Sequence, residues 1–362
     1  MKFDSKMPRR PGKLLSDLGE FRLLKEIIIP TVSDGPLSSP LGDDCAYTQL
    51  PDSSQLLVFT SDAAPRPLIW DFTDHAFESW GWYAVAINLS DIAAAGAHPV
   101  AFTSSIDAPG SMSADDLKSF FKGITSACRA LKTPNGGGNI RSAAAFACHG
   151  TAIGLDSTGE PLTRAGCQPD DHVIVVGPSG LFITAFLKAK AQGLGSLSPL
   201  EQESLLRPRP KVREMEILHR AGVLSAASDN SDGVLGALWN IAERSNRAFE
   251  LELLPDHVPN EVLQAATSIG ADPWNLMFCW GDWQVVVTVK RNELARFNQI
   301  AKDNQIEYLH LGKAVTGPPS LVALCGAARR RLNVVRNENF TKTGFNASSE
   351  ENLQYMLHTP LV

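Results

Sequence analysis

The stretch NLSDIAAAGAHP, residues 88–99, restricts the fold more than any other part of the chain. Its alanines and glycine are too small to fill a core well, so a helix made of them predicts close approach by its neighbours. Asp91 lies inside the helix that we expect at residues 79–96, so capping of the helix N-terminus does not explain it. A tightly packed helix and a functional carboxylate are compatible interpretations of this stretch.

Apolar runs of strand length and helix length alternate along the first part of the chain. The helical pattern is clearest after Ser113 and Asp116, a capping pair that precedes an apolar stripe ending at Leu131. A glycine-rich turn is expected at 135–142, before a strand at 144–155. This alternation is typical of an α/β sheet domain with helices on one face. The other expected elements are a helix at 17–29, strands at 44–49 and 56–60, the helix at 79–96 and a strand at 98–107.

The same pattern restarts after the turn-forming stretch DSTGEP. Residues 170–190 predict a strand, a turn and a helix, and residues 191–209 are rich in Gly, Ser and Pro and predict a mobile loop. The polar stretch beyond about residue 335 predicts no element. We therefore expect two α/β domains, an N-terminal one over residues 1–155 and a C-terminal one over residues 156–362.

Composition excludes several classes of function. The 362 residues are 44% hydrophobic with a formal net charge of -6, which gives no general attraction to nucleic acid or to an anionic membrane. No apolar run approaches the roughly 18 to 20 residues of a membrane helix. The six cysteines form no CxxC pair, so a zinc site is not expected. Without a secretion signal, the cysteines predict a reduced, cytoplasmic protein.

Five stretches place Asp or Asn beside Gly or Ser at the end of an apolar element. Such oxygen ligands suit Mg²⁺, and the small neighbours allow backbone N–H groups to approach phosphate. Each aspartate taken alone is more typical of a helix cap or a turn. Their number and order favour a site. The five stretches contain Gly42, Asp43 and Asp44; Ser61 and Asp62; Asn88 and Asp91; Gly137, Gly138 and Asn139; and Asp229, Ser231, Asp232 and Gly233.

This order resembles the thiamine-monophosphate kinase family, in the superfamily that includes aminoimidazole ribonucleotide synthetase and selenophosphate synthetase. The resemblance covers about 290 residues in one register, and NLSDIAAAGAHP and LTRAGCQPDD are its most specific parts. The matching stretches are GDDCA (42–46), TSD (60–62), AVAINLSDIAAAGAHP (84–99), GGN (137–139), LTRAGCQPDD (162–171), RPRPKV (207–212), SDNSDG (228–233) and GDWQVVVTV (281–289).

The resemblance implies an aminoimidazole-ribonucleotide-synthetase-like fold. The N-terminal sheet domain would form a barrel with its copy in a homodimer, and the C-terminal α/β domain would pack beside it. ATP and Mg²⁺ would bind between the domains. Asp91 and Asp232 are the expected catalytic residues. The nucleotide contacts that the resemblance implies are Asn88, Gly137, Gly138, Asn139, Arg164 and Ser231. The metal ligands that it implies are Asp43, Asp44, Asp62, Asp91, Asn139, Asp229 and Asp232.

Three departures from the family concern the metals and the acceptor. Asn139 replaces an aspartate, so one metal would bind more weakly. The family stretch Gly-Gly-Glu-Asp-Tyr-Glu is here CWGDWQ (279–284), which loses two carboxylates. The segment AAPRPLIWDF (63–72) lacks the family's substrate-contacting histidine, and His75 is out of register. The substrate candidates in these stretches are Trp70, Asp71, Asp282 and Trp283. The tryptophans at 70, 80, 82, 274, 280 and 283 are candidates for a new pocket wall, although aromatic residues in such places are mostly core.

The sequence leaves three hypotheses open. The first is an Mg-ATP-dependent kinase that phosphorylates thiamine monophosphate or a related small acceptor. The second is a synthetase-like enzyme of a specialised biosynthetic pathway that uses ATP to activate an amide or carboxylate oxygen. The third is a nucleotide-binding relative without turnover, which Asn139 and the lost carboxylates would favour.

Overall fold

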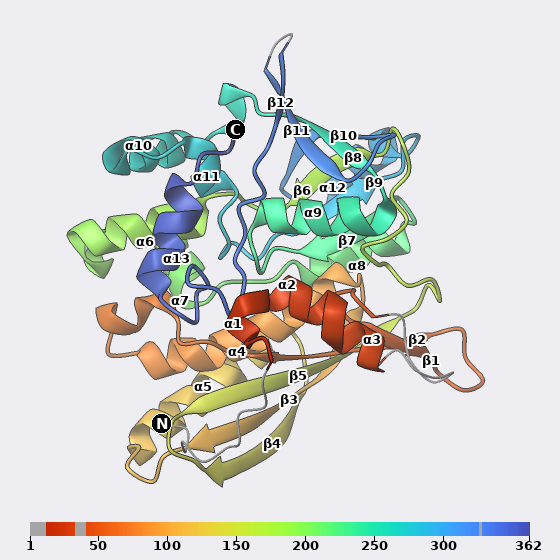
Figure 1. Cartoon of the computed structure of the whole chain (residues 1–362). Helices are drawn as coiled ribbons and strands as arrows, with labels where there is room; N and C mark the ends of the chain where they lie inside the picture. The colour runs from red at the N-terminus through yellow and green to blue at the C-terminus, as the bar shows by residue number, and fades with distance from the viewer. Residues whose placement is uncertain (1–11, 33–40, 326–327) are drawn as a thin grey trace.

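The computed structural model describes residues 12–32, 41–325 and 328–362, and contains two β-sheets with their helices (Figure 1). The first sheet has the strand order β1-β2-β5-β3-β4, and its neighbours are antiparallel except for the parallel pair β3–β4. Helices α4 and α5 pack on one of its faces. The bounds are β1 Ala46–Gln49, β2 Leu56–Ala63, α4 Ala76–Ala94, β3 His98–Ala108, α5 Ala114–Ala130, β4 Asn135–Ser142 and β5 Ala147–Asp156.

The second sheet has the order β12-β11-β8-β10-β6-β9-β7, with β8 and β11 parallel and the other neighbours antiparallel. Its central strands are apolar on both faces, as expected for strands covered on both sides. The strands are β6 His172–Val176, β7 Leu224–Asp229, β8 Ala248–Glu252, β9 Val285–Val289, β10 Tyr308–Val315, β11 Ser320–Cys325 and β12 Ala328–Arg331. The helices are α6 Leu181–Gln192, α7 Pro199–Leu206, α8 Val212–Arg220, α9 Val234–Ser245, α10 Asn260–Ile269, α11 Pro273–Met277, α12 Leu294–Asn304 and α13 Ser349–His358.

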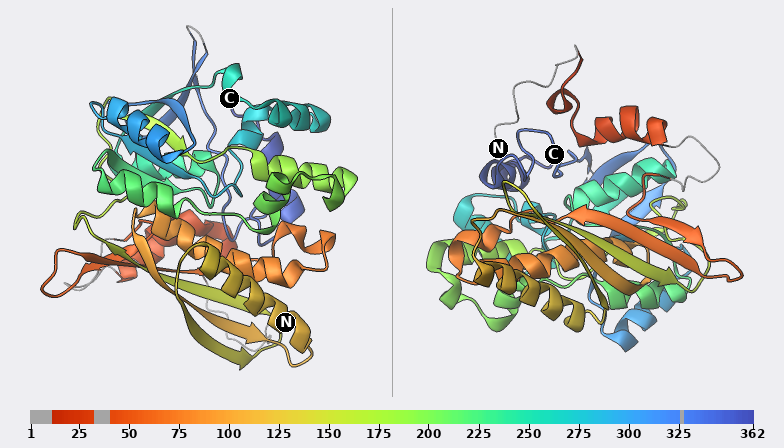
Figure 2. Two further views of the ribbon diagram at one scale, coloured as in Figure 1. Left: turned by 180° about the vertical axis from the view of Figure 1, so that it is seen from behind. Right: turned by 90° about the horizontal axis from the view of Figure 1, so that it is seen from below.

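Helix α4 lies between the two sheets, where it contacts β2 and β5 on one side and β7 and α8 on the other (Figures 1 and 2). It is buried at almost every position. A Cβ atom at Gly81 would lie 2.0 Å from the Phe120 carbonyl oxygen, and one at Gly123 would lie 1.9 Å from the Glu78 carbonyl oxygen. Gly81 of α4 and Gly123 of α5 therefore allow the two helices to approach closely.

The glycine-rich stretch 135–142 is strand β4, and the expectation of a turn there was wrong. It pairs in parallel with β3, which supplies the backbone hydrogen bonds that a glycine-rich segment lacks by propensity. Gly138 is opposite Ser104, and a Cβ atom there would meet the Ser104 carbonyl oxygen at 1.8 Å. The glycines thus allow close strand approach at a sheet edge.

The stretch 191–209, expected as a mobile loop, contains the 3-10 turn η3 (Leu194–Ser196) and helix α7. Ser198 and Glu201 form a capping box, and Leu205 is fully buried. The indole N–H of Trp82 donates to the Pro208 carbonyl oxygen at 2.7 Å, and the Tyr83 hydroxyl donates to that of Leu205 at 2.9 Å. These bonds to α4 order the segment despite its composition.

The two ends of the described chain also differ from expectation. The helix predicted at 17–29 is broken at Gly19, which has φ +73°. The polar C-terminal stretch, for which no element was expected, contains α13. The N-terminal pieces are α1 Leu15–Leu18, α2 Glu20–Leu23, the π-helical turn η1 Leu24–Ile28 and α3 Ile29–Val32.

Candidate active site

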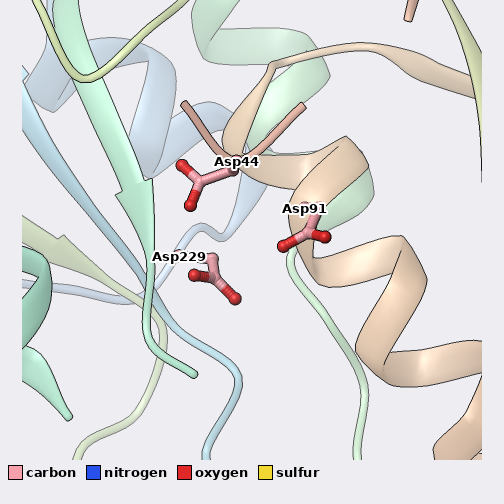
Figure 3. A group of neighbouring side chains, drawn as sticks. All are labelled: Asp44, Asp91 and Asp229. Carbon is pink, nitrogen blue, oxygen red and sulfur yellow. The ribbon is translucent and has the colours of Figure 1, made fainter. Parts of the chain in front are cut away.

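Three carboxylates from separate elements converge where the two sheets meet α4. Asp44 precedes β1, Asp91 lies in α4 and Asp229 ends β7. One oxygen of each lies within 4.8 Å of the others, and Figure 3 shows the three groups facing one another. Asp91 and Asp229 are 7% and 4% exposed. Bringing three like charges together in a buried place is unfavourable unless a cation or protons compensate.

Hydroxyl groups on neighbouring elements orient these carboxylates. The Thr60 hydroxyl on β2 donates to Asp91 at 2.7 Å, and the Ser90 hydroxyl on α4 donates to Asp229 at 3.1 Å. Ser231 also donates to Asp229, at 3.1 Å. The N-terminal sheet, α4 and the end of β7 are therefore tied together at the acidic cluster.

Arg164 holds the acidic loop before β1. Its backbone N–H donates to Asp43 at 2.8 Å, and its guanidinium donates to Asp44 at 2.5 Å and to the Gly42 carbonyl oxygen at 3.3 Å. The Asp44 carboxylate raises the pKa of Arg164 against the effect of burial, so Arg164 stays charged. One arginine nevertheless compensates only part of the negative charge in this cluster.

Burial and mutual repulsion raise the pKa values of the clustered acids. Burial is the largest cause for Asp91 and Asp229, and the neighbouring carboxylates raise both pKa values further. Burial also raises the pKa of Asp232 to about 7. A divalent cation would remove this penalty, and buried carboxylate oxygens on three elements are the donors that Mg²⁺ prefers. The described residues therefore fit a magnesium site.

The cluster borders a cavity of about 580 Å³ between the N-terminal sheet and the C-terminal part of the chain. Three kinds of surface line it besides the acids. Helical segment 20–32 contributes apolar side chains, and Arg66 contributes a positive charge. The aromatic lining consists of Phe21, Tyr83, Phe182, Trp280, Trp283 and Phe345.

Most of the site residues expected from the sequence line this cavity, and a smaller group does not. The expected residues that line the cavity are Asp43, Asp44, Asp62, Asp91, Arg164, Asp229, Ser231, Asp232 and Trp283. The expected residues that do not line it are Trp70, Asp71, Asn88, Gly137, Gly138, Asn139 and Asp282.

Asn88 lies beneath the site and holds Asp62. Its side-chain oxygen accepts a hydrogen bond from the Asp62 backbone N–H at 3.0 Å, and its amide nitrogen donates to the Ala84 carbonyl oxygen at 2.9 Å. A Cβ atom at Gly150 would lie 2.2 Å from that nitrogen. Within one subunit, Asn88 therefore positions a carboxylate of the cavity from below.

Gly137, Gly138 and Asn139 lie on the edge strand β4 and are exposed. Gly138 is level with Asp62 across the sheet, through Ser104 on β3 and Gly150 on β5. Three strand spacings separate the two, about 14 Å. Within one subunit, the GGN stretch is therefore remote from the acidic cluster.

Trp70 and Asp282 make contacts that stabilise the fold and do not line the cavity. Trp70 packs edge-on against the rings of Phe77 and Trp80. The Asp282 carboxylate accepts backbone hydrogen bonds from Gly180 and Phe182 at 2.7 Å each, at the start of α6. Asp71 lies in the 3-10 turn η2 (Leu68–Phe72) and is exposed.

The two lost carboxylates of the CWGDWQ stretch have structural replacements. Gly281 has φ +113°, and a Cβ atom there would lie 2.2 Å from the ring of Phe182, which occupies the space that a glutamate would need. The Gln284 side chain donates to Ser179 at 2.9 Å and accepts from Asn230, the residue after Asp229. A glutamate at 284 could not donate to Ser179, so the amide suits this buried network.

Sequence reasoning missed the part of the cavity wall that the two ends of the chain build together. The Asn339 backbone and side-chain N–H groups donate to Glu20 at 3.0 and 2.9 Å, and the Arg336 guanidinium lies 3.3 Å from the centre of the Phe21 ring. We call residues 20–32 and 336–346, which meet through these contacts, the terminal clasp. No local sequence pattern predicts a contact between residues more than 300 positions apart.

Among the described residues, no helix combines the length and the apolar composition needed to cross a membrane.

The chain matches the AIR synthase related protein N-terminal domain over residues 42–155 and the C-terminal domain of the same name over residues 168–322. It is 31% identical to a thiamine-monophosphate kinase of Pyrococcus abyssi over 258 residues, 70% of this chain and 78% of that protein. The solved thiamine-monophosphate kinase of Stenotrophomonas maltophilia K279a has a TM-score of 0.65 at 26% identity, covering 86% of this chain and 98% of that one.

The fold is also similar to a structure described as AaThiL complexed with AMPPCP and TMP, with a TM-score of 0.71 at 22% identity, covering 89% of this chain and 99% of that one. The acidic stretches identified in the sequence lie within the two matched domains. The chain therefore belongs to the thiamine-monophosphate kinase family of AIR synthase related proteins.

Proposed function

We propose that this protein transfers the γ-phosphoryl group of Mg-ATP to the phosphate of thiamine monophosphate. The observation that carries the proposal is the convergence of Asp44, Asp91 and Asp229 at a cavity between the two sheets. The relatives named thiamine-monophosphate kinase, and the neighbour described with AMPPCP and TMP, support the choice of nucleotide and acceptor.

In the proposed reaction, Asp44, Asp91 and Asp229 would hold Mg²⁺, and Asp43, Asp62 and Asp232 would serve as further oxygen ligands or water-binding groups. Bound Mg²⁺ would supply neutralisation of the charge on the phosphoryl oxygens. Asp91 and Asp232 are the proposed catalytic residues, since both lie on the cavity. Arg164 and Ser231 are the proposed nucleotide contacts within this subunit.

The chain offers positioning and charge rather than a nucleophile of its own. An oxygen of the acceptor phosphate bonds to the γ-phosphorus while the bond from that phosphorus to the bridging oxygen breaks, and ADP leaves. Thr60, Ser90 and Asn88 act through the carboxylates that they orient.

We further propose a homodimer formed through the N-terminal sheet. Helices α4 and α5 cover one face, whereas Phe59, on the opposite side of β2 from buried Val58, is 38% exposed. A sheet face with an exposed aromatic residue favours covering by another surface. The proposed contribution of Asn139 to metal and nucleotide requires such a partner, because β4 lies three strand spacings from β2, which carries Asp62, within one subunit.

We propose a cytoplasmic location on the ground of cysteine chemistry. Cys45, Cys128, Cys148, Cys167 and Cys279 are all free and buried. Free thiols that form no disulfide suit a reducing compartment, which is also where ATP is plentiful.

A synthetase-like use of ATP is the second candidate. The Phe182 ring takes the place of a family carboxylate beside Gly281, so the acceptor end of the cavity differs from the family pattern. In that case ATP would phosphorylate an amide or carboxylate oxygen, an amine would displace the phosphate, and free phosphate would accumulate.

The test incubates the purified protein with Mg-ATP and thiamine monophosphate and measures thiamine diphosphate and ADP by mass spectrometry. The proposal expects both products in equal amounts from the native protein and neither from Asp91→Ala. ATP binding without products, measured by calorimetry, would reject thiamine monophosphate as acceptor, and amines and acids would then be screened for phosphate release. ATP binding without turnover on any acceptor would favour a non-catalytic relative.

A further inference from the structure

Arg66 lies on the cavity, in the rewritten segment between β2 and η2. It is exposed, and the same cavity is lined by six aspartates and by Glu20. Its presence there needs an explanation, because the segment shares no motif with the family stretch that it replaces. A cation at this place affects whatever binds beside the acids.

Among the described residues, the Arg66 guanidinium has no ion-pair or hydrogen-bond partner, in contrast to that of Arg164, which also lines the cavity. Arg164 is bound to Asp44 and to the Gly42 carbonyl oxygen. Over residues 12–32, 41–325 and 328–362, no carboxylate oxygen lies within 4.0 Å of the Arg66 guanidinium, and no hydrogen bond of that group is found. Its donors are therefore available to a ligand in this part of the structure.

Arg66 contacts an aromatic ring rather than a charge partner. Its guanidinium carbon lies 5.7 Å from the centre of the Trp70 ring. Trp70 is held in turn by Trp80, at 5.4 Å between ring centres, and the Trp80 indole N–H donates to the Ala64 carbonyl oxygen at 3.0 Å. Pro65 and Pro67 flank Arg66 and restrict its backbone.

These observations describe an unpaired guanidinium that lines the same cavity as a metal-type carboxylate cluster. A planar guanidinium binds phosphate through two parallel N–H donors. The carboxylates suit the metal-bound phosphates of the nucleotide, so the free cation suits a second phosphate that brings its own charge. We infer that Arg66 binds the phosphate group of the acceptor and selects phosphorylated over unphosphorylated acceptors. This inference rests on the proposed function.

The test compares Arg66→Ala and Arg66→Lys with the native protein. The control is Arg207→Ala: Arg207 also lies over a tryptophan, Trp82 at 5.9 Å, but it pairs with Glu78 and does not line the large cavity. Steady-state kinetics give KM values for ATP and for thiamine monophosphate. Calorimetry in the presence of Mg²⁺ and a non-hydrolysable ATP analogue gives the affinities for thiamine monophosphate and thiamine.

Arg66→Ala is expected to raise the KM for thiamine monophosphate about 10- to 100-fold, the loss typical of a charge-assisted hydrogen-bonded contact. The KM for ATP and the affinity for unphosphorylated thiamine should stay within about twofold of the native values. The KM of Arg66→Lys for thiamine monophosphate should lie between those of the native protein and Arg66→Ala, because lysine keeps the charge but not the paired donors. Arg207→Ala should behave as the native protein. Equal weakening of thiamine and its phosphate, or no weakening, would overturn the inference.

Failure of the proposed function gives a different result. The native protein would then form no thiamine diphosphate, and the Arg66 inference would be read from the binding of inorganic phosphate to the protein saturated with Mg²⁺ and the ATP analogue. Binding that is lost in Arg66→Ala and kept in Arg207→Ala supports an acceptor-phosphate role. Equal phosphate binding by both variants, or no binding by the native protein, contradicts it.

Discussion

Asp91 is the residue on which the site depends most. It lies inside a buried helix, accepts from Thr60 and faces Asp44 and Asp229, and no cationic side chain pairs with it in the part of the chain that the structure describes. Burial raises its pKa, and the nearby carboxylates raise it further. An uncompensated buried charge reduces stability, and retaining one in a core helix indicates a gain in function.

Replacing Asp91 by asparagine should reduce kcat by about 100-fold or more, the loss typical of a charged group that acts on the transition state. Asparagine preserves the shape of the side chain and its bond from Thr60. The matched control is Asp71→Asn, because Asp71 is an exposed aspartate that does not line the cavity. Steady-state assays of both variants check the prediction, and an equal effect of the two substitutions would contradict the placement of the site.

At the scale of elements, the site depends on close contacts that glycine permits. Gly281 combines φ +113° with the Phe182 ring where a Cβ atom would be, at the corner that leads into β9. Gly270 has φ +67° but nothing within 4 Å of such an atom. The two glycines therefore separate the cost of steric overlap from the cost of a left-handed backbone.

Gly281→Ala should lower the free energy of unfolding by about 2–4 kcal/mol, since overpacking is added to backbone strain. Gly270→Ala should cost only about 1 kcal/mol. Urea denaturation measures both values. Costs of equal size would show that the Phe182 ring does not restrict position 281.

The terminal clasp is the second element-scale feature. Glu20 accepts hydrogen bonds from the backbone and side-chain N–H groups of Asn339, whereas Glu26 pairs with Arg22 on its own helical segment. Glu20→Ala should therefore increase amide hydrogen exchange over residues 20–32, because it removes two hydrogen bonds to the C-terminal segment. Glu26→Ala serves as the control and should leave that exchange almost unchanged. Unchanged exchange in Glu20→Ala would mean that Phe21 and Arg336 hold the clasp without it.

The sequence predicts those features that local patterns determine. The acids follow apolar elements at their ends, and Asp43, Asp62, Asp91, Asp229 and Asp232 indeed line one cavity. Features that depend on residues far apart in the sequence could not be predicted from local patterns. The GGN stretch becomes a strand only because β3 lies beside it, α7 is ordered by Trp82 and Tyr83, and the clasp joins the two ends of the chain.

For the whole molecule, the acidic cluster links stability to pH and to metal. The pKa values of Asp91 and Asp229 are raised by burial, and that of Asp232 reaches about 7. The folded, metal-free protein therefore binds more protons than the unfolded chain, whose aspartates titrate at about 3.9. Its stability falls as the pH rises from about 4 through 7.

Mg²⁺ should oppose this trend, because it binds the same carboxylates once their protons have left. The Tm in Mg²⁺ minus the Tm in a chelator should thus be larger at about pH 8 than at about pH 5. In the chelator at the higher pH, Asp91→Asn should melt above the native protein, since it removes one repelling charge. Thermal denaturation of both proteins measures these values, and a metal effect independent of pH would contradict the assignment of the ligands.

The two sheets and α4 together place the acids of both halves of the chain around one cavity. The first sheet ends at Asp156, and the second begins at His172. The division into domains at residues 155 and 156 and the homodimer remain predictions. Light scattering tests the second, and a monomer would contradict the proposed pairing of the N-terminal sheets.

The most direct measurement follows the γ-phosphoryl group itself. The protein is incubated with Mg²⁺, thiamine monophosphate and ATP carrying an isotopic label only in its γ-phosphate, and the products are separated. The account predicts that the label appears in the terminal phosphate of thiamine diphosphate, one for each ADP formed, and that Asp91→Asn forms almost none. Label found in free phosphate, with thiamine monophosphate unchanged, would contradict the proposed transfer.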